Sequence, residues 1–133
     1  MRKYRIVSVL LAAGLLAGCA AAEQKTAEST WHAISQDEAK RMMEQEKGFL
    51  IVDVRTAEEF AEGHIPGAVN VPNESISENS MPQELPDKDQ ILLIYCRSGN
   101  RSRQAAEKLA KTGYTNLYEF GGINTWSGEI TTE

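Results

Sequence analysis

The fold is decided by the segment Ile91-Leu92-Leu93-Ile94-Tyr95-Cys96-Arg97-Ser98-Gly99-Asn100-Arg101-Ser102. Residues 91–95 are the most hydrophobic run beyond the N-terminal region, which predicts the central strand of a sheet buried on both faces. A helix is predicted from Ser102 to Lys111, closed by Gly113. The loop between strand and helix contains Gly99 and Asn100, the residue types that most easily adopt a positive φ. A buried strand, a tight loop and a helix are therefore expected to follow one another.

The same alternation of strands and helices continues on both sides of this segment. A second buried strand is predicted over 49–54, and shorter strands are predicted over 31–34, 69–71 and 117–120. Helices are expected after Ser35 and Thr56, because each is followed three residues later by a glutamate in capping-box spacing. A turn at Gly121-Gly122 should lead into a terminal helix around 123–126. The alternation predicts an α/β fold, a three-layer α/β sandwich around a mostly parallel sheet of about five strands.

The loop after the central strand has the composition of an anion-binding site. Ligands of parallel sheets bind beyond the carboxyl ends of the strands, which is where Cys96 stands. Backbone N–H groups of the loop and the N-terminus of the following helix would attract a negative charge. The Cys96 thiolate can be that anion, its pKa lowered from about 8.5, while Arg97 and Arg101 can attract an anionic substrate. The alternative is a structural cysteine buried at a strand end, beside solvated arginines.

The N-terminal region predicts export. Arg2, Lys3 and Arg5 precede an apolar run over 6–16. This run is shorter than the roughly 20 residues of a membrane span, which is typical of a signal peptide. The following Leu16-Ala17-Gly18-Cys19 resembles the lipobox of bacterial lipoproteins, in which the signal is cut before a cysteine that then receives a lipid. The alternatives are a plain signal peptide with an incidental cysteine, and an uncleaved helix of a soluble protein.

The lipobox resemblance predicts the organisation of the chain. We expect a signal peptide at 1–18, the lipidated Cys19 with a flexible tether to residue 30, a domain over 31–128 and a C-terminal tail over 129–133. The lipid on Cys19 would anchor the exported protein to a membrane, on its extracytoplasmic or periplasmic face. Once Cys19 is lipidated, Cys96 has no partner within the chain for a disulfide.

The charge of the chain limits its partners. The net charge is −5, and loss of the three basic residues of the signal peptide, with no acidic residue, changes it to −8. An acidic mature chain argues against nucleic acid, and against an anionic membrane surface, as a partner. Any anion binding must then come from a local arrangement such as the loop after Cys96.

The loop sequence Cys96-Arg97-Ser98-Gly99-Asn100-Arg101-Ser102 resembles the active-site loop of rhodanese-homology domains. Asp53-Val54-Arg55, Gly63-His64-Ile65-Pro66-Gly67-Ala68 and Gly121-Gly122 with Trp126 also match that family's pattern, in order and at similar spacing. The resemblance implies a thiosulfate sulfurtransferase that passes sulfur from a small anionic donor to cyanide, a thiol or a protein acceptor through a persulfide on Cys96. It implies no metal and no organic cofactor. The sulfur would be bound by backbone N–H groups of the residues after the cysteine: Arg97, Ser98, Gly99, Asn100, Arg101 and Ser102.

Loop length separates these domains from related phosphatases, which carry an arginine six positions after the cysteine. Ser102 occupies that position here, and Arg101 occupies the one before it. This spacing disfavours a phosphatase, whereas a persulfide carrier for a protein partner and, less favoured, an arsenate reductase stay open as alternatives. Asp53, Arg55 and His64 are expected to support the site, the acid because a carboxylate at a buried strand end needs a partner. His64 is expected to form local hydrogen bonds rather than to act as a general base.

Overall fold

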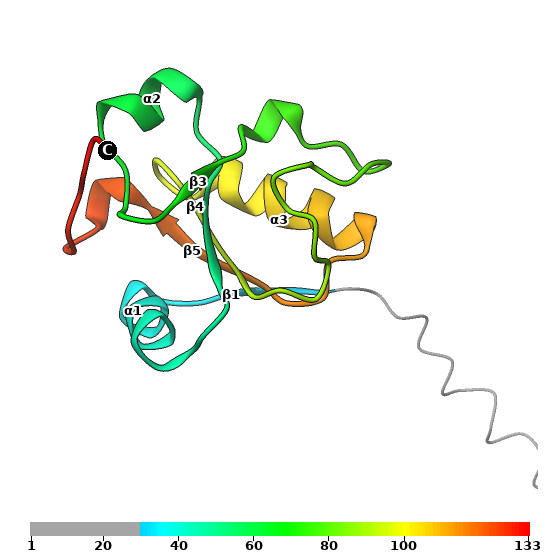
Figure 1. Cartoon of the computed structure of the whole chain (residues 1–133), viewed down its shortest axis with the longest axis horizontal. Helices are drawn as coiled ribbons and strands as arrows, with labels where there is room; N and C mark the ends of the chain where they lie inside the picture. The colour runs from blue at the N-terminus through cyan, green and yellow to red at the C-terminus, as the bar shows by residue number, and fades with distance from the viewer. Residues whose placement is uncertain (1–29) are drawn as a thin grey trace, which may run out of the picture.

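A computed structural model describes residues 30–133 of the chain (Figure 1). The predicted signal peptide, Cys19 and the tether as far as residue 29 lie outside the described residues and stay predictions. Within residues 30–133, no helix has both the length and the apolar character that crossing a membrane requires.

The described residues form a sheet of five parallel strands in the order β1-β5-β4-β2-β3. The strands are β1 (Trp31–Ala33), β2 (Leu50–Asp53), β3 (Val69–Asn70), β4 (Leu92–Cys96) and β5 (Leu117–Gly122). β4 lies in the middle, and every one of its residues is buried, as expected for a parallel strand covered on both faces. The predicted α/β fold around a parallel sheet of about five strands is confirmed.

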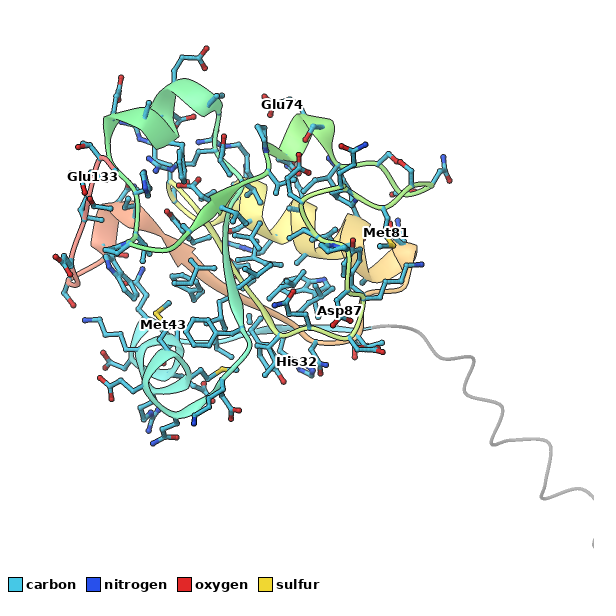
Figure 2. All side chains as sticks on the ribbon, viewed as in Figure 1. His32, Met43, Glu74, Met81, Asp87 and Glu133 are labelled. Atoms are coloured by element: carbon cyan, nitrogen blue, oxygen red, sulfur yellow. The ribbon has the colours of Figure 1, made fainter. Side chains whose placement is uncertain are left out.

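Helices cover both faces of this sheet. α1 (Gln36–Gln45) and α3 (Asn100–Thr112) lie on opposite sides of it in Figure 1, and α2 (Ala57–Glu62) follows β2. On the α3 side, Ala105 and Leu109 share one apolar cluster with alternate residues of β4. On the other side, Met43 of α1 lies between its helix and the sheet, as Figure 2 shows. Two short 3-10 helices, η2 (Asn73–Ser75) and η3 (Ile123–Thr125), complete the described elements.

The predicted helix starts are close to those observed. Thr56 forms the full capping box with Glu59 ahead of α2, and Ser35 accepts a hydrogen bond from the N–H of Glu38 ahead of α1. α3 begins at Asn100, two residues before the predicted Ser102. Gly99 adopts a left-handed conformation with φ of 106°, and this turns the chain into the helix directly after the loop.

The end of β5 differs from the predicted turn. Gly121 and Gly122 are the last residues of the strand, and Gly122 pairs with Cys96 across the sheet. The strand continues this far because Gly122 has no side chain. A Cβ atom there would lie 1.9 Å from the carbonyl oxygen of Arg97, which no packing allows. The following segment is a single turn of 3-10 helix, shorter than the predicted terminal helix.

Candidate active site

Cys96 is the last residue of the central strand, and its side chain is almost fully buried under the loop that follows. The N–H of Gly99 points at the sulfur, with 3.0 Å between nitrogen and Sγ. The Sγ atom also lies 3.4 Å from the hydroxyl oxygen of Ser102. The loop therefore curls around the sulfur, with the start of α3 beneath it.

The surroundings of Cys96 act on its pKa in opposite directions. Burial raises the pKa, because a thiolate loses hydration there. Hydrogen bonds from the hydroxyl and N–H of Ser102, and from the N–H groups of Gly99 and Ser98, lower it, and the net pKa of the thiol falls below its ordinary value. The loop thus favours a thiolate, the form in which cysteine is a nucleophile.

The loop is held in this shape from β5 and the segment after it. The carbonyl oxygen of Arg97 accepts a hydrogen bond of 3.1 Å from the N–H of Asn124. The same carbonyl lies where a side chain at Gly122 would be. Gly122 is needed because two backbone segments approach each other closely here, whereas Gly121 is favoured by its positive φ of 93°.

The two arginines of the loop have different surroundings. Arg101 donates from both of its terminal nitrogens to the carboxylate of Glu59, at 2.7 and 3.0 Å, and this pair is partly buried. Arg97 is exposed, and its side chain forms no hydrogen bond or ion pair with any residue in 30–133. Arg97 is therefore the freer cation for an anionic ligand, while Arg101 joins the loop to α2.

The Glu59–Arg101 ion pair should make the free energy of unfolding depend on pH. The hydrogen bond from Arg101 holds the pKa of Glu59 at about 2, below the usual value near 4.3. A lowered pKa stabilises the fold above the unfolded-state pKa, and this contribution is lost as the pH falls toward 2. Glu59→Gln should cost about 1 kcal/mol at neutral pH, a difference that shrinks between about pH 4.5 and 2. Urea unfolding at several pH values measures it.

The matched control for this prediction is Glu58→Gln. Glu58 shares the first turn of α2 with Glu59 and is exposed, so this variant removes the same charge near the helix N-terminus without breaking an ion pair. An equal loss of stability in both variants would assign the effect to the helix end rather than to Arg101.

Asp53 and Arg55 form a buried ion pair at the end of β2. Arg55 donates from Nη2 to Oδ2 of Asp53 at 2.7 Å and to the carbonyl of Gly63, also at 2.7 Å. The hydroxyl of Tyr95 donates to the same carboxylate at 2.6 Å and accepts from the N–H of Ile65. This network connects β2, β4 and the segment after α2, and its members form no hydrogen bond with Sγ of Cys96.

Comparison with known proteins agrees with this fold. The family model described as the Rhodanese-like domain matches residues 35–129. The chain belongs to the rhodanese-like family. Thiosulfate sulfurtransferase GlpE from Pseudomonas putida is 33% identical over 106 residues, covering 79% of this chain and 93% of that protein. Putative sulfur carrier protein YrkF from Bacillus subtilis is 33% identical over 97 residues, covering 72% of this chain and 51% of that protein. The crystal structure of a rhodanese-like domain protein from Staphylococcus aureus is similar at a TM-score of 0.65 and 34% identity, covering 77% of this chain and 98% of that one.

His64 of this rhodanese-like domain contacts both the neighbouring helix α2 and the C-terminal residues. Its ring stacks on Phe60, with 3.7 Å between centroids, and its Nδ1 lies 2.8 Å from the carbonyl oxygen of Phe60. Its Nε2 lies 3.0 Å from the main-chain oxygen of Glu133, which Figure 2 shows beside the α2 region. The backbone of His64 also pairs with Thr131. His64 therefore joins the C-terminal residues to the domain.

Sequence reasoning missed two acidic residues of this rhodanese-like site. Glu59 was predicted only as part of a helix cap, and its pairing with Arg101 spans 42 positions along the chain. Glu119 of β5 is 4% exposed and accepts a hydrogen bond of 2.6 Å from Ser102. The sequence did contain a signal for Glu119, because it is an acidic residue inside a predicted strand. A buried carboxylate needs a hydrogen-bonding partner. Residues 30–133 hold no group of three His, Cys, Asp or Glu side chains placed for a metal ion.

Proposed function

We propose that this protein is a sulfurtransferase that moves the sulfane sulfur of thiosulfate, or of a similar anionic donor, to cyanide or a thiol acceptor through a persulfide on Cys96. The observation that carries the proposal is the buried sulfur with the Gly99 N–H directed at it at 3.0 Å. The same donors that lower the pKa of Cys96 would also stabilise negative charge on a persulfide. The relative from Pseudomonas putida, named a thiosulfate sulfurtransferase, supports this choice of donor.

The reaction would proceed in two halves. In the first, Sγ of Cys96 bonds to the outer sulfur of thiosulfate, the sulfur–sulfur bond of the donor breaks, and its electron pair leaves with sulfite. In the second, cyanide or a thiolate bonds to the terminal sulfur of the persulfide, and the electron pair returns to Sγ. Arg97 is exposed in the loop and would attract the anionic donor. The expectation that this takes place outside the cytoplasm, with a lipid on Cys19, belongs to the same proposal and rests on the sequence.

The surroundings of Arg101 argue against a phosphatase. An arginine that holds a phosphoryl group must offer its guanidinium to the ligand. Both terminal nitrogens of Arg101 donate to Glu59 instead. A protein carrier of persulfide sulfur is the second candidate, favoured by the relative named a putative sulfur carrier.

The test is to treat the reduced full chain with thiosulfate and measure its intact mass together with thiocyanate formation from cyanide. A gain of one sulfur atom on the peptide that contains Cys96, with turnover, is the expected result. Cys19→Ser is the matched control and should load sulfur equally well. A mass gain without turnover would favour the carrier. If neither the mass gain nor turnover appears while Cys96 is reduced, the proposal is contradicted. Arsenate and phosphate esters then become the next substrates to test.

A further inference from the structure

A carboxylate lies buried directly beneath the candidate loop. Glu119 is 4% exposed, and its Oε1 accepts hydrogen bonds from the hydroxyl of Ser102 at 2.6 Å and from the N–H of Gly121 at 2.8 Å. No Lys, Arg or His of residues 30–133 forms an ion pair with it. A buried carboxylate without a cation is costly, so its place beside a reactive cysteine calls for a reason.

Ser102 connects this carboxylate to the sulfur. The Sγ of Cys96 lies 3.4 Å from the hydroxyl oxygen that bonds to Glu119, and Ser102 itself is fully buried. A hydroxyl has one proton and two acceptor sites. When the proton of Ser102 is directed at Glu119, its shortest contact, the oxygen can accept a hydrogen bond from the thiol. The three side chains then form a continuous path for a proton.

The charges around this path are few. A pocket of 440 Å³ borders Glu119, and its other charged side chain is Arg103 of α3, whose Nε donates to the carbonyl of Gly99. Arg101, which is paired with Glu59 of α2, interacts electrostatically with Cys96. β1 and α1 bring only uncharged residues to the pocket: Ala33, Ile34, Ser35 and Gln36. Glu119 and a Cys96 thiolate are separated by only two hydrogen bonds. Their negative charges would therefore repel, so that ionisation of one group disfavours ionisation of the other.

We propose that Glu119 is a positioning residue that shares one proton with Cys96 through Ser102. When Cys96 holds its proton, the thiol donates to the oxygen of Ser102 and the hydroxyl of Ser102 donates to Oε1 of Glu119. When Cys96 attacks its donor, the thiol proton moves to the oxygen of Ser102, and the hydroxyl proton of Ser102 moves to Oε1 of Glu119. The new sulfur–sulfur bond then forms, and sulfite leaves with the electron pair of the bond that breaks. The site holds one negative charge throughout, first on the carboxylate and then on the persulfide, and no other acid, base or oxidant is needed.

The donor in this step rests on the proposed function, whereas the sharing of the proton does not. The test therefore uses iodoacetamide, a neutral reagent that alkylates thiolates and needs no sulfur donor. The second-order rate of alkylation of Cys96 in the full chain is measured from about pH 4 to about pH 10, the range over which carboxylates and thiols titrate. Mass spectrometry of the peptide that contains Cys96 separates it from Cys19.

Glu119→Gln is the informative variant, because its amide oxygen can keep both hydrogen bonds of Oε1 while the side chain cannot be ionised or take a proton. Removing a negative charge near a thiol favours the thiolate. We expect the main inflection of the alkylation rate to move down by about one pH unit, so that the variant reacts about tenfold faster near neutral pH.

Two further variants separate proton sharing from a merely structural role. Ser102→Ala removes a hydrogen bond to Sγ and keeps the carboxylate, so its inflection should move to higher pH, opposite to Glu119→Gln. Glu107→Gln, on the exposed side of α3, should leave the profile unchanged. An unchanged or raised inflection in Glu119→Gln would overturn the proposed sharing of the proton. If Cys96 nevertheless loads sulfur from thiosulfate, the proposed function is still supported. A lowered inflection without sulfur loading would keep the proton sharing and contradict the proposed function.

Discussion

Replacing Cys96 with serine is expected to lower sulfur transfer from thiosulfate to cyanide by about 10³-fold or more, as removal of a covalent nucleophile does. A serine hydroxyl is not ionised near neutral pH, and its oxygen cannot form a persulfide. The variant should lose both thiocyanate formation and the gain of one sulfur atom in its intact mass. Both are measured on full-length protein after treatment with a reductant.

The fold should survive this substitution, which makes the loss of activity informative. Serine is slightly smaller than cysteine, and its oxygen can accept the hydrogen bond that Gly99 donates to Sγ. Thermal unfolding should therefore change little, and circular dichroism should match the wild type. Turnover of Cys96→Ser above about a tenth of the wild-type rate would place the reacting group elsewhere and contradict a persulfide mechanism at this residue.

Local patterns in the sequence were sufficient to predict the architecture and the position of Cys96. The central strand could be predicted because its run of apolar residues is uninterrupted, and the loop because Gly99 and Asn100 come a few residues after the strand. The capping box at Thr56 could be predicted because both of its partners lie within one turn of helix. In each case, the residues that decide the structure are neighbours in the chain.

The parts that could not be predicted depend on residues that are distant in the chain. Gly122 is needed because the carbonyl of Arg97, from another strand end, lies against it. Glu59 reaches Arg101 only because α2 folds back over the loop, and no spacing rule for helices or strands covers such a pair. Glu119 was read as one more strand residue, since the sequence does not show that its side chain faces Ser102. The shape and charge of the site therefore depend on contacts that only the fold creates.

Asp53→Ala is expected to destabilise the domain by about 3–5 kcal/mol, the usual cost of removing one partner of a buried ion pair. The substitution leaves the guanidinium of Arg55 buried, with Arg55 only 6% exposed, and leaves the hydroxyl of Tyr95 without its acceptor. Since small domains have about 5–15 kcal/mol of stability in total, a large part of the variant should unfold at modest urea concentrations. Urea unfolding of both proteins at neutral pH measures the difference.

The double variant Asp53→Ala with Arg55→Met separates loss of the pair from loss of packing. Removing both charges eliminates the unpaired guanidinium, so the double variant should be more stable than Asp53→Ala alone. Molecules of Asp53→Ala that remain folded should still load sulfur on Cys96, because the network around Asp53 holds the segment at Gly63 and Ile65 and forms no hydrogen bond with Sγ. A loss of stability below about 1 kcal/mol in Asp53→Ala would show that the ion pair is dispensable. A folded variant that fails to load sulfur would instead place Asp53 in the reaction.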